Sequence, residues 1–358
     1  MNHKHFLRMA TAACALIAVL GANPAHAELN KVHFEVITGN HTDPFTKDYQ
    51  QPFFNEQLAK ASGGRITAKA TPYTQLGLGG YEIMNLLKLG TNDISWSVPG
   101  YLAGDSPLVE GLELPGITSD VNVIFKVQDA YRPIVDRELR KKYNAKLLLW
   151  SQQPALQGYC KFSKADADGF SLATMKGKKT RVHSTSFADF VDALGGTPVT
   201  MPFPDVVPAL DRGVLDCALT APTAAYGFKF GQVSNTVVEI RSGYSSQFFA
   251  MNLDSWNKLN PETQKFLTDQ FAKLEADMRD YAHKINDIAA KCLANGPCPL
   301  GEPARMGYVK LTAADEAELK KRVEAVVLPR WGKRAGKAAA EEWNAAVGGL
   351  LGMKIKLD

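Results

Sequence analysis

Residues 260–296, NPETQKFLTDQFAKLEADMRDYAHKINDIAAKCLANG, predict one unusually long helix. Asn260 is a favourable N-cap, and Pro261 takes the first helical position, where its missing N–H costs nothing. The apolar residues that follow are spaced alternately four and three apart: Leu267, Phe271, Leu274, Met278, Tyr281, Ile285 and Ile288. At 1.5 Å per residue this stripe would extend roughly 50 Å, longer than a single small domain. We therefore expect the helix to run along two lobes.

Upstream of this helix, strand-like and helix-like segments alternate. Residues 31–38 (KVHFEVIT) and 65–73 (RITAKATPY) have the pattern of strands, and each is followed by a helical pattern. The alternation continues through 93–100 and 145–153 and resumes in 179–220. Repeated β-α-β units of this kind imply mainly parallel sheets covered by helices.

The bulk composition excludes some classes of protein. The chain has 358 residues, 45% of them hydrophobic, enough for one large or two medium domains. A net charge of +4, with no basic stripe, argues against nucleic acid as a partner. The nucleophile-elbow, zinc-protease, phosphate-loop and dinucleotide motifs are all missing. We expect no cofactor and no catalytic residues, although a hydrolase using a carboxylate pair stays open.

The N-terminal 27 residues have the pattern of an export signal. A short basic start precedes an apolar run from Met9 to Leu20, and the segment ends in Ala25-His26-Ala27. The apolar run is too short to span a bilayer. We expect cleavage after Ala27 and export of a soluble protein to the periplasm.

Export changes the interpretation of the cysteines. Without Cys14 four remain, and an even number in an oxidising compartment favours two disulfides. Cys292 and Cys298 flank a Gly-Pro turn and form the obvious local pair, which leaves Cys160 with Cys217. Free buried thiols and a metal site are the alternatives, but the histidines are scattered, so we expect no metal.

A candidate binding site follows the strand KTRV at residues 179–182. Ser186 and Asp189 have the spacing of a capping box, so a helix should begin at this turn. Ligands of open α/β sheets gather beyond the C-terminal ends of strands, near helix N-termini. From its position in the strand, Arg181 can point into such a crevice and bind a carboxylate with two parallel hydrogen bonds. The alternative is that Arg181 is solvated, as expected for Lys178 and Lys179.

Several blocks of the sequence resemble one family. Residues 175–182 (MKGKKTRV) and 193–220 (ALGGTPVTMPFPDVVPALDRGVLDCALT) are similar to the central block of the substrate-binding proteins of TRAP (tripartite ATP-independent periplasmic) transporters. Three further segments are similar to the N-terminal signatures of that family and occur in the same order: ASGGRI, TQLGLGGYEIMNLLKLGTNDIS and LELPG. The resemblance covers nearly the whole chain after residue 27.

The resemblance implies an α/β fold of the two-lobed periplasmic-binding-protein (type II-like) class, with crossing strands and a lobe-spanning helix. The first lobe would comprise residues 28–152 with about 246–260, and the second 153–245 with part of the C-terminal region. Residues 261–295 would form the long helix, and 296–358 the C-terminal helices that pack on both lobes. The expected partners are the small and large membrane subunits of a transporter, and the protein should be a monomer.

The resemblance also assigns site residues. Arg181 matches the arginine that holds the ligand carboxylate. Weaker candidates for the cleft are Trp96, Ser97, Tyr101, Gln153, Ser184, Phe203, Thr220, Gln247 and Phe248. Many members carry a second arginine where this chain has Cys160, and an asparagine where it has Thr220. The family pattern thus places Cys160 and Cys217 beside the cleft, where a disulfide would replace part of the polar apparatus.

These departures favour a particular ligand. With one arginine instead of two, we expect a monocarboxylate with an apolar or aromatic body, in preference to a dicarboxylate or a sialic-acid-like sugar acid. The predicted function is capture of a small organic acid for a secondary transporter. An exported two-lobe enzyme and a receptor for a membrane sensor are the alternatives.

Overall fold

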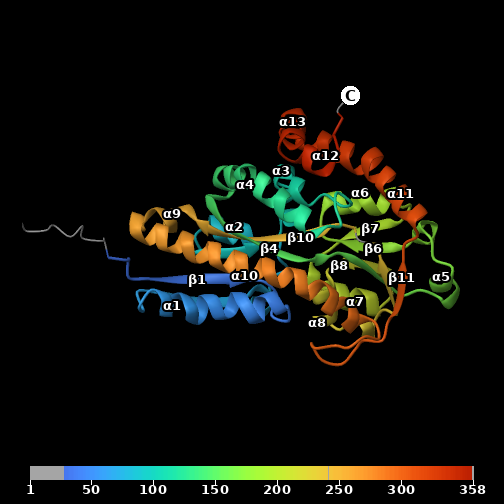
Figure 1. The fold of residues 1–358 in the computed structure, drawn as a ribbon, viewed down its shortest axis with the longest axis horizontal. Coiled ribbons are helices and arrows are strands. Elements are labelled where there is room, and N and C mark those ends of the chain that lie inside the picture. The colour runs from blue at the N-terminus through green and yellow to red at the C-terminus, as the bar shows by residue number, and fades with distance from the viewer. Residues whose placement is uncertain (1–27, 241, 357–358) are drawn as a thin grey trace, which may run out of the picture.

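The strands form two separate sheets (Figure 1). The computed structural model describes residues 28–240 and 242–356, so the predicted signal at 1–27 and its cleavage after Ala27 lie outside the described residues. The first sheet has the order β2 (Ile66–Pro72), β1 (Val32–Thr38), β3 (Ile94–Ser97), β10 (Tyr244–Asn252) and β4 (Ala145–Ala155). The second has the order β11 (Gly307–Lys310), β9 (Thr236–Glu239), β5 (Gln157–Cys160), β8 (Cys217–Thr220), β6 (Lys179–Val182) and β7 (Thr197–Thr200). We call each sheet with its helices the first and the second lobe.

Both sheets are mixed, which corrects the expectation of mainly parallel pairing. Strands β1, β2 and β3 are parallel, and so are β6, β7 and β8. However, β10 pairs antiparallel with β3 and β4, and β5 pairs antiparallel with β8 and β9. The antiparallel strands lie where the chain crosses between lobes. Only Leu156 separates β4 from β5, so one extended segment enters both sheets and its direction is set by the crossing.

Helix α10 (Pro261–Leu293) confirms the lobe-spanning helix and runs diagonally across both lobes (Figure 1). It packs on β4 of the first lobe and on α8 (Pro222–Gly227) of the second. The Asn260 side chain accepts a hydrogen bond of 2.8 Å from the Thr263 N–H, as expected of an N-cap. Leu267, Phe271 and Ile285 of the predicted stripe are at most 1% exposed.

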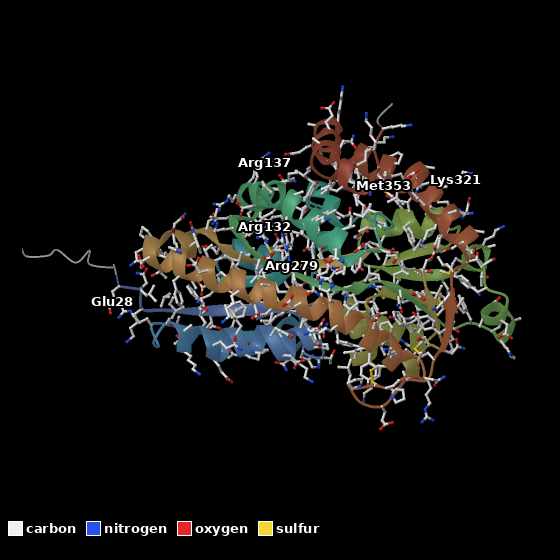
Figure 2. All side chains as sticks on the ribbon, viewed as in Figure 1. Glu28, Arg132, Arg137, Arg279, Lys321 and Met353 are labelled. Carbon is white, nitrogen blue, oxygen red and sulfur yellow. A yellow bond between two sulfur atoms is a disulfide. The ribbon has the colours of Figure 1, made fainter. Side chains whose placement is uncertain are left out.

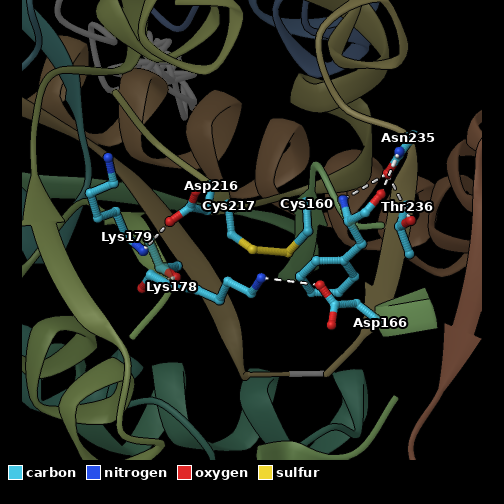
Figure 3. The surroundings of a disulfide bond; sticks show 10 residues. Cys160, Asp166, Lys178, Lys179, Asp216, Cys217, Asn235 and Thr236 are labelled. Carbon is cyan, nitrogen blue, oxygen red and sulfur yellow. Dashed lines mark hydrogen bonds and ion pairs between the residues drawn. A yellow bond between two sulfur atoms is a disulfide. The ribbon is translucent and has the colours of Figure 1, made fainter. Parts of the chain in front are cut away.

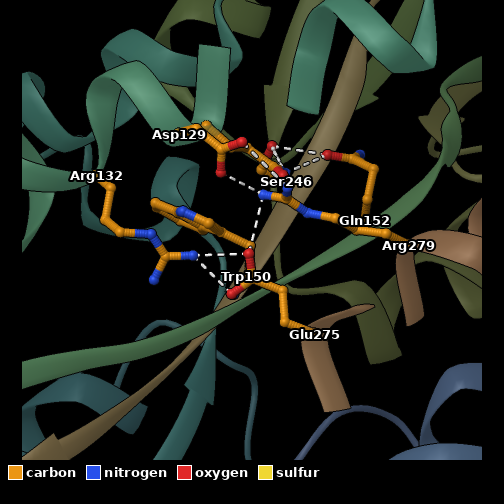
Figure 4. Close-up of polar contacts among 8 residues, drawn as sticks. Asp129, Arg132, Trp150, Gln152, Ser246, Glu275 and Arg279 are labelled. Atoms are coloured by element: carbon orange, nitrogen blue, oxygen red, sulfur yellow. Dashed lines mark hydrogen bonds and ion pairs between the residues drawn. The ribbon is translucent and has the colours of Figure 1, made fainter. Parts of the chain in front are cut away.

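An ion network ties α10 to the first lobe (Figure 4). Arg132 of α4 (Val121–Tyr143) donates to both carboxylate oxygens of Glu275, at 2.7 and 2.6 Å. Glu275 also accepts from the Trp150 N–H of β4 at 3.0 Å. Arg279, one turn further along α10, pairs with Asp129 at 2.6 Å. The network joins α4, β4 and α10, so the long helix is held in a defined position on the crossing strand.

The remaining helices cover the sheets and bridge the lobes. Their bounds are α1 (Leu58–Ala61), α2 (Ile83–Lys88), α3 (Pro107–Glu110), α5 (Lys164–Asp168), α6 (Thr185–Ala193), α7 (Val206–Asp211), α9 (Leu253–Asn257), α11 (Ala313–Arg322), α12 (Leu328–Ala335), α13 (Lys337–Trp343) and α14 (Gly349–Leu351). Helix α12 packs on α3 and on α6, so the C-terminal region contacts both lobes. Arg137 of α4 is labelled in Figure 2. It donates to both carboxylate oxygens of Glu342 of α13, at 2.9 and 2.6 Å. Thr312 and Asp315 form a capping box at the start of α11.

Two disulfides are present. Cys160 and Cys217 face each other on the antiparallel pair β5 and β8 (Figure 3). Cys292, near the end of α10, is bonded to Cys298. The predicted pairing of Cys160 with Cys217 is therefore confirmed, and it joins segments 57 residues apart. Within residues 28–240 and 242–356, no helix is long and apolar enough to cross a membrane.

Candidate functional site

A pocket lies between the two lobes, where the parallel strands of both sheets end. From the first lobe it is lined by residues that follow β1, β2 and β3, and from the second by residues that follow β6, β7 and β8. Its lining is Asn40, Asp43, Tyr73, Trp96, Val98, Tyr101, Gln153, Leu156, Arg181, His183, Phe203, Thr220, Ala221, Ala224, Ser245 and Gln247. The space open to the centre of a water-sized sphere is about 50 Å³. One water needs roughly 10–15 Å³ by this measure, so the closed pocket suits a small molecule.

Arg181 projects from β6 into this pocket and is only 2% exposed. Its Nε donates to the Met201 carbonyl at 3.2 Å and its Nη1 to the Leu219 carbonyl at 3.3 Å. The guanidinium lies over the Phe203 ring, 5.5 Å from the centroid. Its Nη2 is buried and has no hydrogen-bond partner among the described residues. A buried donor on a permanently charged group is costly to leave unpaired, so Nη2 is available for an anion.

Aromatic side chains of the first lobe form the wall near Arg181. The Tyr73 ring stacks on Trp96 with centroids 5.2 Å apart and an angle of 4°, and Tyr101 meets Trp96 edge to face. The Trp96 indole N–H donates to Gln247 at 2.9 Å, which fixes the ring. Burial raises the pKa of the Tyr73 and Tyr101 hydroxyls, while the charge of Arg181 acts in the opposite direction. Both phenols stay protonated and can donate hydrogen bonds.

A chain of hydrogen bonds crosses the pocket from one lobe to the other. The Gln153 amide N–H donates to Asp43 at 2.7 Å, and its carbonyl oxygen accepts from the Thr223 hydroxyl at 2.6 Å. Asp43 also accepts from the Phe45 N–H at 2.9 Å. Burial raises the pKa of Asp43 to about 7, against the effect of these two donors. The pocket thus contains an acidic group as well as the Arg181 cation.

Two further acids lie at the closed interface beside the pocket. Glu113 accepts from the Gly100 and Ser246 N–H groups at 2.6 and 2.9 Å, and burial raises its pKa well above the usual value. His183 Nε2 lies 3.6 Å from a Glu113 oxygen, but burial lowers the His183 pKa to about 3. The imidazole is neutral at pH 7, so this contact is not an ion pair. Glu110 of the first lobe accepts from the Ser186 N–H of α6 at 2.9 Å.

The structure brings most of the predicted site residues together. Those that line the pocket are Arg181, Trp96, Tyr101, Gln153, Phe203, Thr220 and Gln247. Ser97, Ser184 and Phe248 are buried outside its lining. Ser184 is the N-cap of α6 and accepts from the Phe187 N–H at 3.4 Å. Phe248 packs edge to face on Trp150 in the core of the first lobe.

One expectation drawn from local spacing is wrong. The helix cap is Ser184, two residues before Ser186, and no capping box forms between Ser186 and Asp189. Asp189 instead pairs with Arg334 of α12 at 2.5 Å, a contact between segments far apart in the sequence. Cys160 and Cys217 are absent from the lining of the pocket. Thr220, at the C-terminal end of β8, lines it, and Cys217 lies three residues away at the other end of that strand.

Several lining residues were not predicted from the sequence, chiefly Asn40, Asp43, Tyr73 and His183. Each follows directly, or within a few residues, the C-terminal end of a parallel strand. The rule that ligands gather at such ends, applied to β1 and β2 as it was to β6, would have found them. No group of residues suited to hold a metal ion occurs within the part of the chain that the structure describes.

Comparisons with known proteins agree with this architecture. The family model of the bacterial extracellular solute-binding proteins, family 7, matches residues 37–330. An uncharacterized protein of Salmonella typhimurium is 26% identical over 219 residues, which are 60% of this chain and 65% of that protein. An extracytoplasmic solute receptor of Bordetella pertussis that binds pyroglutamic acid superposes with a TM-score of 0.78 at 21% identity, covering 88% of this chain and 99% of the receptor. A marine metagenome TRAP solute binding protein in complex with metahydroxyphenylacetate gives a TM-score of 0.74 at 21% identity, covering 90% and 98%. The two-lobed fold is confirmed.

Proposed function

This chain belongs to family 7 of the bacterial extracellular solute-binding proteins, and from that membership we propose that it captures a small organic acid between its lobes. Members of this family bind solutes and are not enzymes, so the hydrolase alternative is set aside. The protein would act in the periplasm and deliver the acid to the membrane subunits of a TRAP transporter. A receptor for a membrane sensor would use the same binding chemistry with a different partner.

The unpaired Nη2 of Arg181 is the observation that carries this proposal. Two of the donors of the guanidinium are used by backbone carbonyls, and Phe203 supports its face. These contacts hold the group in one orientation before any ligand arrives. A ligand carboxylate placed at Nη2 would gain a charge-assisted hydrogen bond from a preorganised donor.

The shape and chemistry of the pocket favour a monocarboxylate with an apolar or aromatic body. One arginine faces the cavity, and Tyr73, Trp96, Tyr101 and Phe203 provide flat apolar surface. The small cavity volume argues against a bulky sugar acid. The Bordetella receptor binds pyroglutamic acid, and the marine protein binds metahydroxyphenylacetate. Both compounds are small and carry one carboxyl group, consistent with this choice.

The test is a thermal-shift screen against a panel of small organic acids, followed by calorimetry on those that raise the melting temperature. Replacing Arg181 with alanine should weaken binding of the selected acid by at least about a hundredfold, because it removes the partner of a buried carboxylate. Arg181→Lys should also bind weakly, since lysine lacks the planar fork.

The matched control is Lys179→Ala, which removes an exposed cation from the same strand. It should leave the affinity unchanged, and circular dichroism should show that all variants are folded. Unchanged affinity in a folded Arg181→Ala variant would contradict the proposal. If cells lacking this chain lost uptake of the selected acid, the result would favour a role in transport over a role in sensing.

A further inference from the structure

Asp43 is a buried carboxyl group in the wall of the pocket, on the lobe opposite Arg181. It follows β1 and is 3% exposed. Its Oδ1 accepts from the Phe45 N–H, and its backbone carbonyl accepts from the Lys47 N–H at 3.0 Å. Asp43 thus also stabilises the turn in which it lies. This role in the turn accounts for the hydrogen bond to Oδ1, but it does not explain why the Asp43 carboxyl group lines the cavity.

The second oxygen, Oδ2, accepts from the Gln153 NH₂ group at 2.7 Å. An ionised carboxylate can only accept, so the Gln153 NH₂ group faces Asp43, and the Gln153 carbonyl oxygen accepts from the Thr223 hydroxyl of the other lobe at 2.6 Å. A carboxylate has about four acceptor positions, and the protein uses two of them here. A buried carboxylate with spare acceptor positions is stabilised by any further donor placed in the cavity.

The two charged groups of the lining make the pocket electrically asymmetric. Arg181 comes from β6 of the second lobe, and Asp43 follows β1 of the first. Tyr73 lies near both charges: the charge of Arg181 lowers the Tyr73 pKa, and the charge of Asp43 raises it. A second ligand carboxylate directed at Asp43 would meet an acid in a poorly solvated space and be repelled. A neutral N–H or O–H there would instead complete its hydrogen bonding.

We propose that Asp43 selects ligands carrying an N–H or O–H donor at the end remote from their carboxylate, and that it disfavours dicarboxylates of similar size. The proposal rests on the proposed function, because Arg181 must hold the carboxylate end for the other end to reach Asp43. Asp43 would then be the specificity-determining residue of the first lobe.

The test compares probes that differ only in the donor. One pair is 3-hydroxyphenylacetate and phenylacetate, which differ in a hydroxyl remote from the carboxylate. A second pair is 5-hydroxypentanoate and pentanoate, and glutarate is the dicarboxylate of the same length. Calorimetry on the wild-type protein at pH 8, above the pKa of about 7 that burial gives Asp43, should give the donor-bearing member of a bound pair an affinity about tenfold to a hundredfold higher, as expected for one hydrogen bond to a charged group. Glutarate should bind more weakly than either donor-bearing acid.

Asp43→Asn is nearly isosteric and keeps an oxygen for the Phe45 N–H, but turns an acceptor into a donor. In this variant the ratio within a pair should fall to about one or reverse, while the donor-free member keeps its affinity. Asp48→Asn is the matched control, because Asp48 is an exposed acid near enough to raise the pKa of Asp43. It should leave the ratio unchanged.

The outcomes distinguish the two proposals. A wild-type protein that binds both members of a pair equally would overturn the role of Asp43 while leaving the proposed function intact. So would an Asp43→Asn variant that keeps the wild-type ratio, or a wild-type protein that prefers glutarate. If none of the monocarboxylates bound the wild-type protein, the proposed function would fail, and this inference with it. The wild-type ratio is independent of whether the variant folds.

Discussion

His183 is a buried imidazole whose titration differs between the folded and the unfolded chain. Burial lowers its pKa from 6.5 to about 3, and the nearby Arg181 charge acts in the same direction. Below pH 6.5 the unfolded chain therefore takes up a proton that the folded protein does not bind. Stability supplied by the neutral imidazole is present above pH 6.5 and is lost as the pH falls toward 3.

We therefore expect His183→Gln to flatten part of the acid limb of the stability profile. Between pH 6.5 and pH 4.5 the wild-type protein should lose about 2 kcal/mol more than the variant, from the linkage relation. Urea unfolding at several pH values measures this difference. His33→Gln, at an exposed position on β1, controls for loss of one imidazole. Parallel profiles for wild type and His183→Gln would refute the assignment of a neutral imidazole.

Between elements, the two disulfides constrain loops of very different length. The Cys160–Cys217 bond joins β5 to β8 and closes a loop of 57 residues, whereas Cys292 and Cys298 are six residues apart. The long loop contains β6 and α6, and so the strand that carries Arg181. A disulfide stabilises mainly by restricting the unfolded chain, and more so for longer loops.

Replacing Cys160 and Cys217 together with alanine should therefore lower the free energy of unfolding by about 4 kcal/mol, against about 2 kcal/mol for Cys292 and Cys298. Urea unfolding followed by tryptophan fluorescence measures both losses, and the second double variant is the control for the first. Peptide mapping of the non-reduced wild-type protein should find the same two pairs. Equal losses would show that loop length is not the source of the stabilisation.

At the level of the whole molecule, the lobes meet in a contact that leaves no room for a side chain at Gly100. A Cβ atom added there would lie 2.8 Å from the Ser184 Cβ atom and 2.9 Å from the His183 ring, both in the second lobe. It would also lie 2.8 Å from the Glu113 carboxylate of the first lobe. Such distances are below normal contact, so the interface would have to open.

Gly100→Ala should therefore hinder closure more than folding. We expect ligand affinity to fall at least about tenfold, because overpacking at a close contact costs about 1–3 kcal/mol and this cost would oppose closure of the lobes. Small-angle scattering with saturating ligand should give a larger radius of gyration than for wild type. Gly104→Ala is the matched control, since no atom lies within 4 Å of its added Cβ. If Gly100→Ala closed as far as wild type, the interface would be more plastic than the close contact suggests.

Sequence patterns that span a few residues predicted the local structure of α10 correctly. The N-cap at Asn260 and the apolar stripe of α10 depend on helical geometry alone, and both were found from the sequence. The pairing of Cys160 with Cys217 was also predicted, by elimination after the local pair Cys292 and Cys298. The family resemblance indicated Arg181, whose motif ends in β6, and its role in binding stays a prediction.

Long-range contacts were beyond such patterns. Nothing local to Asp43 indicates that it meets Gln153, 110 residues away, or that Thr223 donates to that amide from the other lobe. Asp189 has the spacing of a capping-box residue relative to Ser186, yet its carboxylate accepts a hydrogen bond from Arg334 of α12. Cys160 and Cys217 pair as expected but do not line the pocket, because Cys217 begins β8 whereas the lining residue Thr220 ends it. The periodicity of a helix or strand depends on residues that are neighbours in the sequence. A pocket instead forms where the ends of distant strands come together, and only the packing of the two lobes determines which strand ends those are.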